Sequence, residues 1–167
     1  SVERIHHEIE AGRLAYRDRN LYLADPEFSD VPVTAMLSQE QADLIRAQIN
    51  PNKALDTLPE STLPRHKSTV YISVVDKDRN ACSFINTVFH NFGAGILAPK
   101  SGVILQNRGQ GFVVEPGHPN CIEPSKRPLH TIIPGMATKD GKTVMSFGVM
   151  GGEYQAFGHM QFLTRFF

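Results

Sequence analysis

Apolar positions in the first third of the chain recur with the period of helices. They predict a helix over about residues 2–19, which Pro26 follows, and the residue before a proline is pushed out of the helical region. The apolar positions on this face are Ile5, Ile9 and Leu14. Ser38 with Gln41 forms a capping-box pattern, and a second helix is expected over about residues 39–49.

The pattern changes in the middle of the chain. Residues 51–68 contain three prolines and several polar side chains, which favours an exposed connector. After Lys67 the sequence becomes rich in β-branched residues, and strands are predicted over 69–75 and 81–89 around a turn at 76–80.

Later apolar runs are short and are separated by Gly, Pro and Asn. They predict further strands near residues 102–106, 111–114, 129–133 and 143–149. A last helix is expected after Gly151 and Gly152. Helices, a connector, antiparallel strands and a final helix together indicate an α+β fold.

Composition and charge exclude several classes of function. The 167 residues carry no formal net charge, with a pI near 7.0, so no standing attraction to nucleic acid or to an anionic membrane is expected. No run approaches the roughly 18 apolar residues that a membrane span needs. The chain opens on a charged helical pattern without a signal peptide, so its localisation stays unknown, with the cytoplasm favoured over a periplasmic or secreted location.

Metal, redox and nucleotide sites are not indicated. The two cysteines form no CxxC motif, and Cys82 in its apolar run is expected to be a small buried side chain. The seven histidines lack HExxH spacing, and residues 76–80 begin like a calcium loop but lack its Gly and Glu. No GxGxxG or P-loop is present. No cofactor and no metal are therefore expected.

The run Ser68-Thr-Val-Tyr-Ile-Ser-Val-Val-Asp76 resembles the processing site of gamma-glutamyltranspeptidases, in which a Thr precedes a Ser-Val-Val-Asp strand. Other segments match the same family in order, and the likeness spans nearly the whole chain. These segments are Ala15–Arg19, Tyr22–Pro26, Phe92–Ile96, Pro116–Gly117, Lys126–Pro128 and Gly151–Gly152. The resemblance implies an autoprocessing N-terminal-nucleophile hydrolase with an αββα sandwich, of which this chain is a fragment.

By this resemblance the chain divides at the bond between Ser68 and Thr69. Residues 1–68 correspond to the end of the large subunit with its connector, and residues 69–167 to the first part of the small catalytic subunit. The remaining segments of both subunits are then expected partners.

The resemblance also assigns the catalytic roles. Thr69 is the implied nucleophile, and cleavage before it frees an α-amine that can serve as its base. Thr87 is implied to hydrogen-bond and aim the nucleophile. Gly151 and Gly152 are implied to form the oxyanion hole, since glycines at a helix start let backbone N–H groups face developing negative charge. Without the resemblance, each would be an ordinary strand or turn residue.

The implied substrate pocket departs from the family pattern. Phe89, Arg108 and Gly111 stand where the glutathione-using enzymes carry an Asn, a Gln and an Asp. His130 and Thr131 stand where those enzymes carry paired serines. Loss of the Asp removes a partner for a substrate ammonium, whereas Arg108 offers a bidentate carboxylate binder. A structural ion pair is the alternative role for Arg108.

Two functions are therefore predicted. The first is a Thr amidohydrolase or acyltransferase that cleaves γ-glutamyl or glutaryl-type amides, in the manner of the cephalosporin acylase branch, with hydrolysis favoured over transpeptidation. The alternative is an inactive, unprocessed fragment or family member that acts only as a structural or binding domain.

Overall fold

The computed structural model describes residues 1–57 and 68–167. The chain forms two compact units. The first unit combines Ser1–Pro64 with Gly109–His130, and the second combines Arg65–Arg108 with Thr131–Phe167. The predicted connector 51–68 lies largely outside the described residues, although Ser68 begins a strand.

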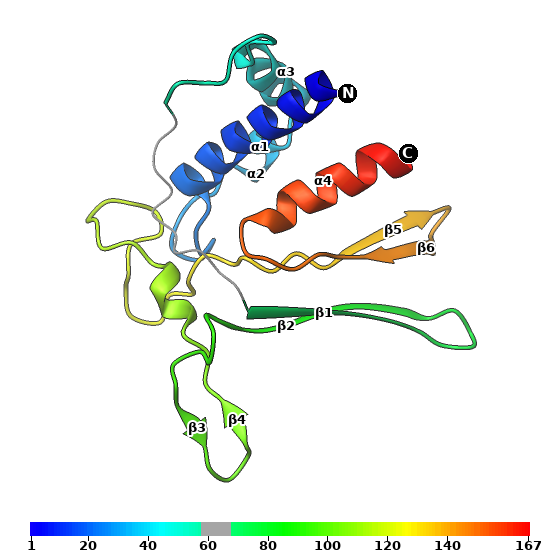
Figure 1. Ribbon diagram of the computed structural model, residues 1–167. Helices are drawn as coiled ribbons and strands as arrows, with labels where there is room; N and C mark the ends of the chain where they lie inside the picture. Colours follow the sequence, from blue (N-terminus) through cyan, green and yellow to red (C-terminus); the bar gives the residue numbers. More distant parts are fainter. Residues whose placement is uncertain (58–67) are drawn as a thin grey trace. The chain divides into compact units, whose positions relative to one another are not determined.

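The described part of the first unit carries the helices labelled α1, α2 and α3 (Figure 1). They are α1 (Val2–Tyr22), α2 (Val33–Met36) and α3 (Gln39–Gln48). The helix predicted over 2–19 is confirmed and continues for one further turn. The predicted cap of α3 is confirmed too, because the Ser38 hydroxyl accepts a hydrogen bond from the Gln41 backbone N–H at 3.0 Å.

Loop segments complete the first unit. Two of them were predicted to be strands, but the Asn120 side chain hydrogen-bonds their backbone instead of a neighbouring strand. The strand predicted over 111–114 is wrong: a short 3₁₀ helix covers Arg108–Gly111, and Val113 makes only an isolated bridge with Cys121. The buried Asn120 side chain donates to the Gly111 carbonyl at 2.7 Å and accepts from the Leu129 N–H at 3.3 Å. It thus satisfies backbone groups in both segments that the sequence assigned to strands.

The second unit begins with a long hairpin. Strand β1 (Ser68–Val75) pairs antiparallel with β2 (Ala81–Phe89), which confirms both predicted strands. The turn between them is held by Asp76, whose carboxylate accepts the N–H groups of Asp78 and Asn80.

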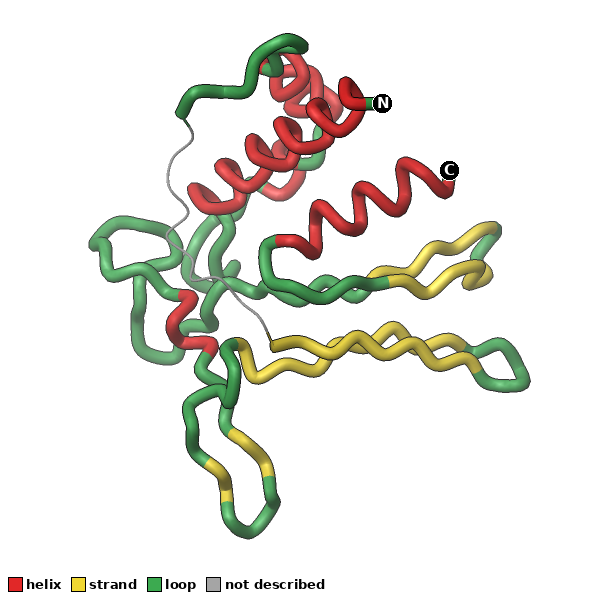
Figure 2. Tube along the Cα trace, viewed as in Figure 1, coloured by secondary structure: helices red, strands yellow, loops and turns green. Residues whose placement is uncertain are grey.

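Two smaller hairpins follow, as Figure 2 shows in yellow. Strands β3 (Leu97–Ala98) and β4 (Val103–Ile104) are shorter than the predicted strand at 102–106. Strands β5 (Gly135–Lys139) and β6 (Lys142–Phe147) form the other hairpin. The strand predicted over 129–133 is wrong. Strand β5 was missed because Pro134 and Gly135 are typical of a break between strands.

Helix α4 (Tyr154–Phe166) confirms the predicted last helix and lies along the β5–β6 hairpin (Figure 1). The ring of Phe147 on β6 contacts the His159 ring of α4 edge-on, with centroids 5.1 Å apart. Neighbouring side chains of a strand point to opposite faces. Accordingly, Ser146 turns away from α4 and hydrogen-bonds the Tyr71 hydroxyl of β1 at 2.9 Å.

Much apolar surface stays exposed. Among residues 1–57 and 68–167, the buried apolar side chains are few: Leu14, Ala24, Ile85, Phe89 and Leu129. Cys82 was expected to be buried, but it is exposed, on the face of β2 that nothing in the described chain covers. Among the described helices, none combines the length and the apolar character that crossing a bilayer requires.

Candidate active site

Thr69 lies at the start of the β1–β2 hairpin, directly opposite Thr87. Directly opposed residues of an antiparallel pair project to the same face of the sheet. The Thr69 hydroxyl donates a hydrogen bond to the Thr87 hydroxyl oxygen, with the two oxygens 3.3 Å apart. The second unit therefore brings together the two threonines that the sequence singled out.

An irregularity in the strand pairing surrounds this contact. Ser68 pairs with Phe89 whereas Thr69 pairs with Thr87, so Val88 is an extra residue of β2. Beyond this bulge Phe89 adopts a φ of 79°, which a bulky residue rarely adopts. The Phe89 N–H donates to the Thr87 hydroxyl oxygen at 3.0 Å, so the bulge orients the hydroxyl that contacts Thr69.

The predicted pocket residues Phe89, Arg108 and Thr131 form one cluster. Phe89 is 1% exposed, and the Arg108 guanidinium carbon lies 5.0 Å from the centroid of its ring. Arg108 Nη1 donates to the Thr131 hydroxyl oxygen at 2.6 Å. The ring of Phe89 thus contacts a cation, whereas its backbone N–H donates a hydrogen bond to Thr87.

The Arg108 guanidinium has no acidic partner among the described residues. Burial lowers the pKa of this group below its ordinary value, because desolvation penalises the charged form. A guanidinium nevertheless stays protonated in proteins. A half-buried cation of this kind gains from a carboxylate ligand, and the alternative of a structural ion pair finds no support in the described chain.

Gly151 and Gly152 connect β6 to α4 through two left-handed residues, with φ of 121° and 60°. These values require glycine or strain any other residue. The two carbonyls accept the Tyr154 and Gln155 N–H groups that open the helix. The glycine N–H groups themselves donate to no acceptor within residues 1–57 and 68–167.

Sequence reasoning missed Gln155. This side chain is 2% exposed, and its amide nitrogen donates to the Thr131 carbonyl at 2.8 Å and to the Gly152 carbonyl at 3.2 Å. A polar residue three positions after a glycine pair, near the start of a largely apolar helix, was the only signal available in the sequence.

Two predicted pocket positions belong to the first unit. Gly111 is buried there with its carbonyl bonded to Asn120, and His130 is exposed. The second unit contains the other predicted residues, and successive contacts link six of them: Thr69, Thr87, Phe89, Arg108, Thr131 and, through Gln155, Gly152.

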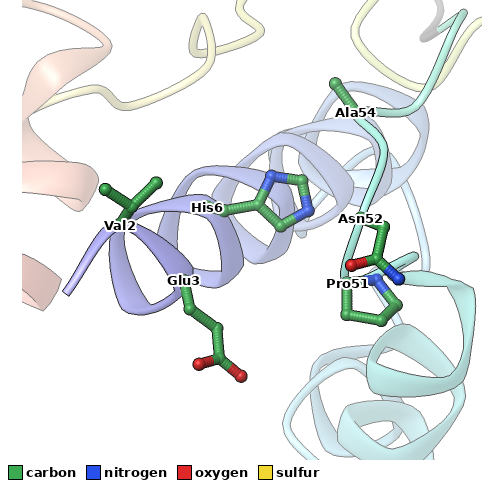
Figure 3. A pocket seen from close by; sticks show the side chains of 6 residues that line it. All are labelled: Val2, Glu3, His6, Pro51, Asn52 and Ala54. Atoms are coloured by element: carbon green, nitrogen blue, oxygen red, sulfur yellow. The ribbon is translucent and has the colours of Figure 1, made fainter.

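No cluster of three or more His, Cys, Asp or Glu side chains in the described chain could hold a metal ion. A depression of about 450 Å³ in the first unit is lined by α1 and residues 51–54 (Figure 3). Its His6 ring is bonded to the Asn50 carbonyl at 2.7 Å, and none of the predicted site residues lines it.

Comparison with known proteins shows the family to which this chain belongs. A family model described as gamma-glutamyltranspeptidase matches residues 1–167, the whole chain. The chain belongs to the gamma-glutamyltranspeptidase family. Its members include proteins named as proenzymes, as the resemblance at Thr69 implied.

Curated relatives of this gamma-glutamyltranspeptidase-family chain carry different activities in their names. A glutathione hydrolase-like YwrD proenzyme of Bacillus subtilis is 35% identical over 165 residues, which are 99% of this chain and 31% of the relative. An oxamate amidohydrolase proenzyme of Klebsiella pneumoniae is 32% identical over 165 residues, with the same two shares of 99% and 31%. The chain thus spans about a third of the length of these relatives.

Solved structures agree with the predicted fold. A cephalosporin acylase from Bacillus halodurans superposes with a TM-score of 0.85 at 40% identity, over 98% of this chain and 29% of the acylase chain. A gamma-glutamyltranspeptidase from Pseudomonas nitroreducens gives 0.51 at 32% identity, over 56% of this chain and 53% of the other. The chain is a mixed helix-and-strand piece of the N-terminal-nucleophile hydrolase fold. The division into subunits at Ser68–Thr69 stays a prediction.

Proposed function

We propose that this chain carries the processing site and nucleophile of an autoprocessing threonine amidohydrolase. The observation that carries the proposal is the hydrogen bond from the Thr69 hydroxyl to Thr87 at the bulged start of the hairpin. A Thr hydroxyl is a weak nucleophile that needs an orienting partner and a base. Thr87 supplies the orientation.

The base arises from self-cleavage. The Thr69 hydroxyl oxygen attacks the Ser68 carbonyl carbon, the carbon–nitrogen bond breaks, and the hydroxyl proton passes to the departing nitrogen. Water then hydrolyses the ester, which leaves a Ser68 carboxylate and a free Thr69 α-amine. An α-amine has a pKa of about 7.7–8.0, so it can accept a proton near neutral pH.

Turnover repeats the same chemistry on a substrate amide. The Thr69 amine takes the hydroxyl proton while the oxygen attacks the acyl carbon, and the N–H groups of Gly151 and Gly152 stabilise the oxyanion. The proton goes to the leaving amine as an acyl-enzyme forms on Thr69. Water then releases the acid, and hydrolysis is favoured over transfer to a second amine.

The pocket supports an acyl group with a terminal carboxylate. Arg108 offers its guanidinium beside the Thr131 hydroxyl and has no acidic partner in the described chain. Phe89 fills the position of a polar glutamyl-binding residue, and its buried ring offers no hydrogen-bond acceptor for a substrate α-amine. A glutaryl-type amide fits this chemistry better than a γ-glutamyl amide, and one structural relative is named as a cephalosporin acylase.

The cleavage step is tested in the full-length protein by intact mass. The wild type is expected to yield two chains separated before Thr69, and Thr69→Ala a single uncleaved chain. Thr69→Ser, which keeps a hydroxyl, is the matched control and is expected to cleave. A wild type that stays in one piece would refute the proposal.

Substrate class is tested on the processed protein with glutaryl and γ-glutamyl 4-nitroanilides. A higher kcat/KM is expected for the glutaryl compound, and Arg108→Ala is expected to remove most of the difference. A clear preference for the γ-glutamyl compound would contradict the role given to Arg108.

A non-catalytic role is the second candidate. A glutathione hydrolase 4 of Arabidopsis thaliana, whose name includes the word inactive, is 35% identical over 164 residues, and the match covers 85% of its length. A protein of that kind is expected to stay uncleaved and to release no chromophore from either anilide.

A further inference from the structure

Gln155 lies between the two functional groups of the proposed site. It is the second residue of α4 and is 2% exposed. Its side-chain amide donates to the Gly152 carbonyl at 3.2 Å and to the Thr131 carbonyl, 24 positions away in the chain, at 2.8 Å. One buried side chain thus ties the glycine pair to the pocket segment.

At the pocket end, Gln155 fixes the residue that orients the cation. The Thr131 carbonyl accepts from Gln155, and the Thr131 hydroxyl accepts from Arg108 at 2.6 Å. The direction of the guanidinium therefore depends on a backbone segment that forms no strand ladder and that the Gln155 amide holds.

At the glycine end, Gln155 restrains a backbone that lacks side chains of its own. The Gly152 carbonyl accepts both the Gln155 backbone N–H and its side-chain amide, each at 3.2 Å. Glycines lose more conformational freedom on ordering than any other residue, so such restraints decide where their N–H groups point.

A helix cap alone does not account for this arrangement. A cap at a helix start must accept from free N–H groups, whereas the Gln155 amide nitrogen donates to two carbonyls, one of them outside the helix. The Gln155 Oε1 atom is buried and accepts no hydrogen bond from the described residues. A buried unsatisfied oxygen is costly, so a residue that served only stability would be a poor choice here.

We propose that Gln155 is a positioning residue that couples the carboxylate pocket of Arg108 to the oxyanion donors at Gly151 and Gly152. The inference rests on the proposed function. It implies that one substitution at Gln155 weakens carboxylate recognition and acyl transfer together.

The test compares two 4-nitroanilides on processed full-length protein. One is the glutaryl compound, and the other is the pentanoyl compound, in which a methyl group replaces the terminal carboxylate. Gln155→Leu is expected to lower kcat on the pentanoyl compound on the order of 10–100-fold, because small displacements of catalytic groups are costly. The preference for the glutaryl compound is expected to fall about tenfold. Gln161→Leu, a glutamine of the same helix outside the site, is the matched control and is expected to keep both values.

Gln155→Glu separates positioning from bulk structure. The protonated acid keeps one donor and the ionised acid has none. Its kcat and its glutaryl preference, each divided by the wild-type value at the same pH, are therefore expected to fall together as pH rises and to recover on acidification. The same variant serves if Gln155→Leu does not fold. An unchanged glutaryl preference in both variants, or equal losses in Gln161→Leu, would overturn the inference.

The affinities for glutarate and pentanoate, measured by calorimetry, do not depend on turnover. They therefore separate the coupling through Gln155 from the proposed amidohydrolase function. The wild type is expected to prefer glutarate, and Gln155→Leu to lose about tenfold of that preference. Retention of the preference in Gln155→Leu, or its absence in the wild type, overturns the coupling. A wild type that prefers glutarate but hydrolyses neither anilide overturns the proposed function alone.

Discussion

At the scale of single residues, the Thr87 hydroxyl oxygen accepts two hydrogen bonds. It accepts from the Thr69 hydroxyl at 3.3 Å and from the Phe89 N–H at 3.0 Å, so it joins the proposed nucleophile to the strained residue beyond the bulge. On the proposed function the same atom contributes to aiming and to folding, so a substitution that removes it is expected to affect both.

Thr87→Val removes this hydroxyl at nearly constant volume. We expect a loss of stability of about 1–3 kcal/mol, because the Phe89 N–H loses its acceptor, and a roughly tenfold slower cleavage before Thr69. Thr87→Ser restores the oxygen and is expected to recover most of both. Thermal unfolding and the time course of chain separation measure them. Cleavage of Thr87→Val at the wild-type rate would argue against an aiming role.

A second residue-scale prediction concerns pH. Arg127 donates to the Asp25 carboxylate through its side chain at 2.7 Å and through its backbone N–H at 2.8 Å, and these bonds hold the pKa of Asp25 well below its usual range. A lowered folded-state pKa adds stability that is complete above the unfolded pKa, near 3.9, and is lost as pH falls toward the folded value.

Asp25→Asn is therefore expected to lower Tm most at neutral pH, and the difference from the wild type is expected to shrink below about pH 4. Thermal unfolding of both proteins between pH 3 and pH 8 measures it. Asp78→Asn, an exposed carboxylate in a turn, is the control. A difference that grows on acidification would show that the ion pair is not what stabilises this turn.

At the scale of elements, close packing holds the β1–β2 hairpin against β6. A Cβ at Gly148 would lie 2.4 Å from the Tyr71 ring, whose hydroxyl bonds Ser146 at 2.9 Å and Ser83 at 3.1 Å. Gly148→Ala should displace this ring and destabilise the protein by about 1–3 kcal/mol, as overpacking does. Gly109→Ala, where the added carbon meets nothing within 4 Å, is the control in the same thermal unfolding measurement. Equal Tm values for the two variants would contradict this packing.

What the sequence predicted, and what it did not, also divides by element. The helices at 2–22 and 39–48 and the β1–β2 strands were predicted because period, cap and turn residues are local signals. Strands at 111–114 and 129–133 were wrong because Asn120 satisfies their backbone from a distance. Gln155 was missed for the same reason, since its partner Thr131 lies 24 positions away. The roles of Thr69 and Thr87 came from family resemblance, and the contact between them from the structure.

At the scale of the whole molecule, one face of β1 exposes apolar side chains to solvent. Its apolar side chains Val70, Ile72 and Val74 are 54%, 41% and 56% exposed, and the chain spans only about a third of the length of its Bacillus subtilis relative. Contiguous exposed apolar residues on a strand mark an interaction surface or an aggregation hazard. We expect segments of the full-length protein to cover this face.

The triple variant Val70→Thr, Ile72→Thr and Val74→Thr tests that expectation, because the substitutions keep β-branching and remove apolar surface. In the isolated 167-residue chain, where the face is open to water, the variant is expected to reduce self-association and leave Tm nearly unchanged. In the full-length protein it is expected to lower stability by several kcal/mol, since each buried apolar side chain contributes about 1.5–3 kcal/mol. Light scattering and thermal unfolding on both lengths measure these effects. An equal, small Tm change in both would mean that the face stays exposed in the full-length protein, and that the hairpin carrying Thr69 depends on its own pairing and on β6 alone.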